Sequence, residues 1–343
     1  GGIENHTRQL AEGLARRGWK VDVLCSSFHS FFIEERRRNL QVHRTPNWGT
    51  VWSQPLSPRI LTQIRRFTDE IVHVQVPFPL GIPACLRLPK NKPLIVTWQS
   101  DIVRQRAARP LLAPLEKMLL RRADAIIASS PKLIEHSRVL PAFREKCRAI
   151  PLGIDPAPFI SPPPEIVELG DALRERLHHP LAVFVGRLVG YKGVDVLVKA
   201  MSRLKDVHCV IVGEGPKKED LKRLSEQEGA ARRIRFTGHV PDKELPAYLH
   251  AADLFVLPSV SRNEAFGICQ LEAMAAGLPV ISTDLESGVP WVNQHEQTGF
   301  VVPPRDVDAL AEAIRILVED RDRAKALGER GKQRVLEMFT AER

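Results

Sequence analysis

Short β-type runs alternate with helical patterns along most of this chain, and this alternation limits the fold more than any other feature. The apolar runs are rich in Val, Ile, Leu and Phe, as in strands buried on both faces. Strands predicted in this way cover 19–27, 71–76, 93–98, 123–130, 147–153, 181–188, 207–215, 233–240, 252–259 and 278–284. The sequence therefore predicts an α/β protein with parallel sheets covered by helices on both faces.

A proline-rich stretch at 155–180 carries no strand pattern and interrupts the alternation once. With 343 residues, the chain exceeds one ordinary domain. We therefore predict two doubly wound, Rossmann-like domains facing a cleft, at 1–155 and 181–343, with a linker at 156–180. Ligands of such sheets bind at the carboxyl ends of the strands.

The chain opens on "GGIENHTRQLAEGL" (1–14), a glycine loop that leads into a helix. Such loops normally follow a strand, and here no strand comes before Gly1. We therefore expect that the first, central strand of this domain is missing and that the sequence is a fragment of a longer protein.

Charge and cysteine content narrow the class of protein. Residues 1–155 hold 25 Lys and Arg against 13 Asp and Glu, whereas residues 156–343 hold 25 against 28. The basic first half favours an anionic partner such as a membrane surface, or it is simply a solubilising surface.

The five cysteines are scattered and form no C-x-x-C pair, which argues against a disulfide framework or a zinc site and fits a reducing cytoplasm. No apolar run is long enough to span a membrane.

The segment "EAFGICQLEAMAAG" (264–277) places two glutamates around a predicted helix start. The backbone N–H groups of 265–268 would be unpaired there, so they can hold an anion. Glu264 lies before the helix and Glu272 inside it, where they can contact different parts of one elongated ligand. The alternative makes Glu264 a capping acid and Glu272 a solvated helix residue.

A second basic loop lies in "FVGRLVGYKGVDVL" (184–197), where Arg187 and Lys192 stand between a strand and a helix. Arginine and lysine beside a helix start suit a diphosphate. The glycine spacing is neither the dinucleotide fingerprint nor a P-loop, which disfavours a nicotinamide dehydrogenase.

The motifs together resemble the retaining glycosyltransferases of family four, which have the GT-B fold. The matching segments run in family order over almost the whole chain, at 1–4, 150–155, 185–197, 211–216, 236–245, 264–283 and 298–306. In detail, the chain resembles a bacterial branch of exopolysaccharide and mannosyltransferase enzymes. The resemblance implies a metal-independent hexosyltransferase that needs no cofactor and takes a nucleotide diphosphate sugar as its donor substrate.

The resemblance also implies roles for individual residues. Glu264 would hold the donor-sugar hydroxyls, Arg187 and Lys192 would bind the diphosphate, and Glu272 would bind the ribose. The remaining donor contacts would come from Gly2, Phe266, Gly267, Ile268 and the base-binding loops at Glu214 and Val240. Retention would follow from front-side displacement, in which the donor phosphate helps to deprotonate the acceptor hydroxyl.

One position departs from the family pattern. Gln99 stands where the family usually has a histidine close to the donor sugar, and a glutamine cannot take up a proton. Gln75 similarly replaces a common histidine, while His73 is retained and is more often structural. We therefore expect either a lower activity or a different arrangement of the site around the donor sugar.

The leading interpretation is a cytoplasmic enzyme, peripheral on the inner face of the plasma membrane, that transfers a sugar to a lipid-linked or glycan acceptor. GDP-mannose is the first expectation for the donor, and nucleic acid is not an expected partner. The segment 100–124 interleaves basic and apolar residues and is either a membrane-docking helix or an ordinary core helix. The alternatives are a transferase that acts on a small soluble sugar or sugar phosphate, and a non-catalytic nucleotide-sugar-binding protein.

Overall fold

The computed structural model describes residues 2–27, 29–51, 54–67, 70–101 and 109–343. The chain divides into two compact units, Gly1–Pro151 and Leu152–Arg343. Each unit contains its own cluster of buried apolar side chains. The segment 156–180, expected as a linker, lies in the second unit and contains two helices.

The second unit is built on a six-stranded sheet, whose neighbouring strands all run parallel. The strand order is β12-β11-β10-β13-β14-β15, the doubly wound order in which the chain starts in the centre and fills first one side and then the other. The strands are β10 (Leu181–Val185), β11 (His208–Val212), β12 (Ile234–Gly238), β13 (Leu254–Leu257), β14 (Val280–Thr283) and β15 (Gly299–Val302). Five of them match the sequence prediction, and β15 was not predicted.

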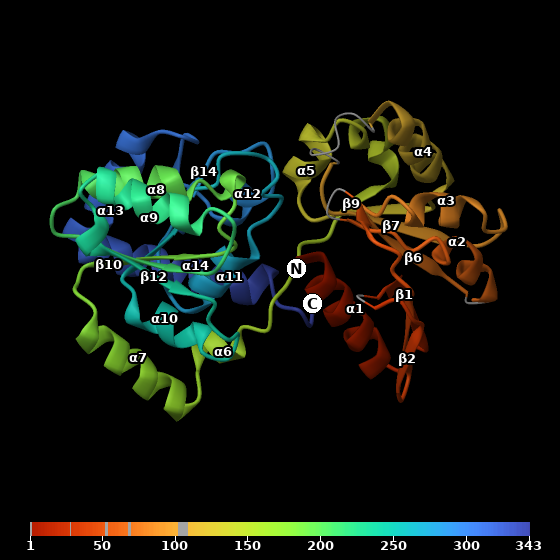
Figure 1. Ribbon diagram of the computed structural model, residues 1–343, viewed down its shortest axis with the longest axis horizontal. Helices are drawn as coiled ribbons and strands as arrows, with labels where there is room; N and C mark the ends of the chain where they lie inside the picture. The colour runs from red at the N-terminus through yellow and green to blue at the C-terminus, as the bar shows by residue number, and fades with distance from the viewer. Residues whose placement is uncertain (1, 28, 52–53, 68–69, 102–108) are drawn as a thin grey trace. The chain divides into compact units, whose positions relative to one another are not determined.

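Helices cover both faces of this sheet (Figure 1). One face carries α8 (Val194–Ser202), α9 (Lys218–Gln227) and α13 (Val307–Glu319). The other carries α10 (Leu245–Ala251), α11 (Ile268–Ala275) and α14 (Arg321–Met338). Short elements are η3 (Gly190–Lys192), η4 (Ala231–Arg233) and α12 (Val289–Val292). Because both faces are covered, β13 and β14 are buried along their whole length, which explains the uninterrupted apolar sequence LFVL of β13.

The first unit contains a parallel sheet in the order β6-β7-β8-β9 and a separate sheet in the order β1-β3-β2. The strands are β1 (Val21–Ser26), β2 (Ile33–Arg37), β3 (Leu40–Thr45), β6 (Val72–Val76), β7 (Leu94–Trp98), β8 (Ala125–Ala128) and β9 (Cys147–Ala149), with a β4 (Thr50–Val51) and β5 (Gln54–Pro55) hairpin. The helices are α1 (Gly2–Arg16), α2 (Ile60–Gln63), η1 (Ile64–Arg66), α3 (Gly81–Leu86), α4 (Arg109–Arg122), α5 (Pro131–His136) and η2 (Leu140–Lys146). Two antiparallel pairings, of β2 with β3 and of β4 with β5, add to the predicted parallel sheets and involve strands that were not predicted.

The expected linker contains α6 (Ala157–Ile160) and α7 (Pro164–Arg176), and α7 packs against α10. The two helices approach closely at Gly170, where an added Cβ would lie 2.8 Å from Cδ2 of His250. A larger residue at this position would therefore force the helices apart. Much of the expected linker is thus held against the second unit by packing.

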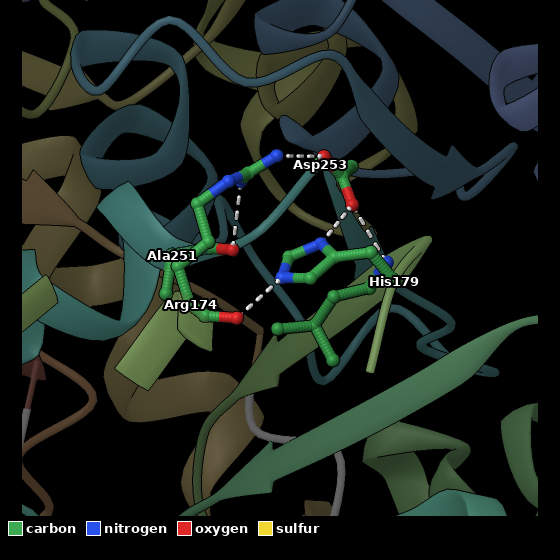
Figure 2. A network of polar contacts seen from close by, with 5 residues as sticks. Arg174, His179, Ala251 and Asp253 are labelled. Carbon is green, nitrogen blue, oxygen red and sulfur yellow. Dashed lines mark hydrogen bonds and ion pairs between the residues drawn. The ribbon is translucent and has the colours of Figure 1, made fainter. Parts of the chain in front are cut away.

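A polar network fixes the end of α7 to the same unit (Figure 2). One carboxylate oxygen of Asp253 accepts a hydrogen bond from Arg174 at 3.0 Å, and the other lies 2.7 Å from Nδ1 of His179. The second oxygen also accepts from the backbone N–H of Leu181 at 2.7 Å, and Arg174 donates to the carbonyl of Ala251. Asp253 therefore joins α7, the start of β10 and the start of β13.

We expect Asp253→Asn to lower the free energy of unfolding at pH 7 by about 1.5–3 kcal/mol, because a carboxylate accepts stronger hydrogen bonds than an amide. Burial alone raises the pKa of Asp253, but hydrogen bonds from His179, Leu181 and Arg174 outweigh it and hold the pKa below its usual value. A carboxyl with a lowered pKa stabilises the fold above its unfolded-state pKa, about 3.9, and this contribution disappears as the pH falls through the folded-state pKa.

Urea unfolding of both proteins between pH 3 and pH 7 measures the effect. The variant Glu312→Gln is the matched control, since Glu312 forms a solvent-exposed pair with Arg315, and such pairs contribute little to stability. If the difference in free energy of unfolding between the wild type and Asp253→Asn did not shrink as the pH falls, the lowered pKa of Asp253 would be contradicted.

Candidate active site

Two loops meet beyond the carboxyl ends of β10 and β13, the neighbouring central strands of the second unit. The backbone N–H of Val260 donates to the carbonyl of Tyr191 at 2.8 Å. Gly193 has a left-handed backbone with φ 66°, and an added Cβ there would overlap the carbonyl oxygen of Pro258 and lie 2.8 Å from Cγ1 of Val260. The close contact between the loops therefore depends on glycine at this position.

This contact brings Lys192 and Glu264 together. Nζ of Lys192 lies 2.6 Å from Oε2 of Glu264, and both side chains are about nine-tenths buried. Burial alone lowers the pKa of Lys192, but the attraction of Glu264 outweighs it and raises the pKa above its usual value. The lysine therefore keeps its positive charge in a site that is largely closed to water.

Ser259 was not predicted as a site residue. Its hydroxyl donates to Oε2 of Glu264 at 3.0 Å, and the residue is fully buried. The ion pair could not be read from the sequence, because Lys192 is distant from Glu264 along the chain, and the bond from Ser259 depends on the conformation of the loop between the two residues. The available signal was that these residues stand at the end of a predicted strand or shortly after it, where the carboxyl ends of neighbouring strands converge.

The start of α11 lies in the same loop region. Gly267, in the left-handed conformation, precedes the helix, which carries no side-chain cap, so the alternative of Glu264 as a capping acid is wrong. Within the described chain, the backbone N–H groups of 265–268 donate no hydrogen bond. Together with the helix dipole, they provide a set of donors suited to an anion.

Two contacts fix the loop that leads into α11. The buried amide of Gln270 donates to the carbonyl of Phe266 at 2.6 Å. The ring of Phe266, which is 3% exposed, lies 6.3 Å from that of Trp291 and 6.0 Å from that of Phe339. The backbone at this helix start is therefore held from both sides.

Glu272 projects from the second turn of α11 and is half-buried. Burial raises the pKa of Glu272 to about 7, with the negative charge of Asp242 adding to the effect and Lys192 opposing it. The alternative of a fully solvated helix residue therefore does not describe it. A carboxyl of this kind is poised to ionise fully when hydroxyl donors approach it.

We expect Glu272→Gln to be more stable than the wild-type protein at pH 8 and about equal to it at pH 5. The folded-state pKa of about 7 lies above the reference value of 4.5, so the folded wild type holds a proton that the unfolded chain loses between these values. Its stability therefore falls as the pH rises from 4.5 to 7, whereas the amide does not titrate. Thermal unfolding across this pH range measures the difference. An unchanged difference between pH 5 and pH 8 would refute the pKa assignment, and Glu226→Gln, at an exposed position of α9, is the control.

The other predicted donor contacts of the second unit lie at the same carboxyl edge. Arg187 follows β10 and is exposed, while Val240 follows β12 and packs against the core. Glu214 follows β11, and its carboxylate is 2.6 Å from Nζ of Lys218. The pKa of Glu214 is lowered, chiefly by this hydrogen bond.

In the first unit, side chains of β6, of β7 and of the residue that follows β7 form a hydrogen-bonded network. The amide of Gln99 donates to Oε1 of Gln75 at 2.9 Å, and the amide of Gln75 lies 3.4 Å from Nε2 of His73. Nε2 of His73 also lies 2.7 Å from the hydroxyl of Thr97. Burial, reinforced by the nearby His6, lowers the pKa of His73 to about 4, so these four hydrogen-bonded side chains carry no charge at neutral pH.

Two further predictions concern the first unit. Gly2 is the first residue of α1. The expected helix at 100–124 is observed as α4 from Arg109 to Arg122, and residues 102–108 of that prediction lie outside the described residues. No helix among the described residues is long and apolar enough to cross a membrane. The described part of the chain also contains no group of three His, Cys, Asp or Glu side chains arranged to hold a metal ion.

Comparison with known proteins matches both units to family models. Residues 1–158 match the model described as Glycosyltransferase Family 4, and residues 169–334 match Glycosyl transferases group 1. The chain is 31% identical to the O-antigen chain mannosyltransferase C of Escherichia coli, over 100% of this chain and 91% of that protein.

Two further relatives extend the comparison. A GDP-mannose-dependent alpha-(1-6)-phosphatidylinositol monomannoside mannosyltransferase of Mycobacterium tuberculosis is 41% identical, over 65% of this chain and 60% of that protein. Among solved structures, a sucrose-phosphate synthase from Thermosynechococcus elongatus superposes with a TM-score of 0.83 at 26% identity, covering 100% of this chain and 90% of that one.

Proposed function

The chain belongs to glycosyltransferase family 4, with the GT-B fold of two Rossmann-like domains, and on this basis we propose that it transfers mannose from GDP-mannose to a lipid-linked or glycan acceptor. Retention of the anomeric configuration is part of the proposal. The observation that carries it is the buried Lys192–Glu264 pair beside the unpaired N–H groups that open α11. Together they offer a cation, an acceptor for hydroxyl groups and an anion site, which are the groups that a nucleotide sugar requires.

Each end of the donor has a matching side chain in the second unit. The diphosphate would lie against the N–H groups at Phe266, Gly267 and Ile268 and against Arg187 and Lys192. The sugar hydroxyls would donate to Glu264, and the ribose hydroxyls would donate to Glu272. The nucleotide base would lie near Glu214 and Val240.

Catalysis in this proposal is electrostatic. When the bond between the anomeric carbon and the diphosphate oxygen breaks, negative charge grows on the diphosphate, where Lys192 and Arg187 stabilise it. The acceptor oxygen bonds to the same face of the carbon and passes its proton to a phosphate oxygen of the departing nucleotide. Glu264 is a poor candidate for a covalent nucleophile, because the ion pair with Lys192 and the hydrogen bond from Ser259 stabilise its negative charge and so lower its nucleophilicity.

Two relatives support mannose as the sugar, since one is named as a mannosyltransferase and the other as GDP-mannose-dependent. The basic first unit supports an acceptor with a phosphate or a location at an anionic membrane surface on the cytoplasmic side. A small sugar-phosphate acceptor is the second candidate, favoured by the structural likeness to a sucrose-phosphate synthase.

A donor screen followed by a turnover assay tests the proposal. GDP-mannose should raise the melting temperature more than UDP-glucose does, because a tighter ligand stabilises the folded state more. The chain should then release GDP in the presence of an alkyl mannoside, which mimics a lipid-linked acceptor, and Glu264→Ala should not. Mannose 6-phosphate, tested in the same assay, represents the small soluble acceptor. If the chain binds GDP-mannose but releases GDP with neither acceptor, a non-catalytic binding protein is favoured.

A further inference from the structure

In the described part of the chain, only one of the two carboxylate oxygens of Glu264 is bound by other side chains. Both of its protein partners, Nζ of Lys192 at 2.6 Å and the hydroxyl of Ser259 at 3.0 Å, contact the same oxygen, Oε2. Among the residues that the structure describes, none forms a hydrogen bond or an ion pair with Oε1. One oxygen is thus committed to the protein, and the other remains available as a hydrogen-bond acceptor.

Ser259 is itself held in place. It follows β13, it is fully buried, and its carbonyl accepts a hydrogen bond from the hydroxyl of Thr283 at 2.5 Å. Thr283 is the last residue of the neighbouring strand β14, so the backbone at Ser259 is fixed between two strands of the sheet. The serine hydroxyl therefore approaches Glu264 from one defined direction.

Lys192 cannot select one carboxylate oxygen by itself. An ammonium group is a compact charge with three rotatable donors, and it attracts either oxygen of a carboxylate. A hydroxyl has one donor whose strength depends on its angle, so the bond from Ser259 favours a single rotation of the carboxylate. Because serine is neutral, it does so without disturbing the charge balance between Lys192 and Glu264.

We propose that Ser259 is a positioning residue that turns Glu264 so that Oε1 accepts a hydrogen bond from a hydroxyl of the donor sugar. This inference rests on the proposed function and deepens it. An ionised carboxylate only accepts hydrogen bonds and repels phosphate, so Oε1 selects the sugar and not the diphosphate. Ser259 would therefore contribute to recognition of the sugar while leaving recognition of the nucleotide unchanged.

Calorimetric titration of Ser259→Ala with GDP-mannose and with GDP tests whether Ser259 contributes to recognition of the sugar and not of the nucleotide. We expect the affinity for GDP-mannose to fall about tenfold, the scale of one hydrogen bond to a charged group, with the affinity for GDP unchanged. Ser259→Thr keeps a hydroxyl and should recover most of the lost affinity. Ser225→Ala, which removes another buried serine hydroxyl that bonds only within α9, should bind both ligands as the wild type does.

A double-mutant cycle shows whether Ser259 acts through Glu264. In a Glu264→Ala background, Ser259→Ala should cause no further loss of GDP-mannose affinity, because the group that it orients is absent. Equal losses for GDP and GDP-mannose, or an undiminished effect in the Glu264→Ala background, would overturn the inference and leave the proposed function intact. Failure of the wild-type chain to bind GDP-mannose would instead overturn the proposed donor and this inference with it.

Discussion

Lys192→Met is expected to reduce the rate of sugar transfer by about 10²–10³-fold, because it removes the positive charge that, in the proposed mechanism, stabilises the leaving diphosphate. The same substitution is expected to lower the free energy of unfolding by about 3–5 kcal/mol, since it leaves the carboxylate of Glu264 buried without its partner. The rate of GDP release measures the effect on transfer, and urea unfolding of the same protein sample measures the effect on stability.

The double variant Lys192→Met/Glu264→Gln separates stability from catalysis. Replacing a buried ion pair with two neutral side chains of similar size is often neutral or stabilising, so most of the lost stability should return. Activity should not return, because the cation and the carboxylate that we propose to bind the sugar are both gone. Recovery of transfer by the double variant would show that Lys192 serves only to neutralise Glu264.

Gly193→Ala is expected to prevent donor binding and to lower the free energy of unfolding. Its left-handed backbone costs a non-glycine residue about 1–2 kcal/mol, and the overlap of the new methyl group with Pro258 and Val260 adds about 1–3 kcal/mol. The loop that carries Lys192 must then move away from the loop that carries Glu264. Calorimetric titration with GDP-mannose and urea unfolding measure these losses.

Gly190→Ala is the matched control for this substitution. Gly190 lies in the same loop, but an added Cβ there meets no atom within 4 Å. Both binding and stability should therefore remain close to those of the wild-type protein. Equal losses in the two variants would show that flexibility of the loop matters, and not its close contact with Pro258.

The predictability of the fold differs between the two units for a physical reason. The strands β10 and β13 are covered on both faces, so their sequences, LAVFV and LFVL, are uninterrupted apolar runs that mark them clearly. The strand β2 has the sequence IEERR and is largely exposed, so it carries no such mark. Its antiparallel pairing with β3 depends on contacts that hydrophobic periodicity does not record.

Prediction of the candidate site was limited in a similar way. The sequence alone predicted Lys192 and Glu264 as site residues, because each stands near a helix start that follows a strand. Their ion pair, and the hydrogen bond from Ser259, depend on how closely two loops approach. That approach is set by the absence of a side chain at Gly193 and by the position of a carbonyl group at Pro258, and neither leaves a pattern in a single sequence.

The attachment of α7 through Asp253 bears on how enzymes of this kind diversify. Lys192, Ser259, Glu264 and Glu272 all lie after Pro151, and the network around Asp253 makes the segment from α6 onward part of the same unit. A gene recombined at the codons for Pro151 and Leu152 would transmit together all of the donor contacts proposed for the second unit. Crossovers inside 174–181 would instead separate Arg174 or His179 from Asp253, so selection should favour the earlier junction.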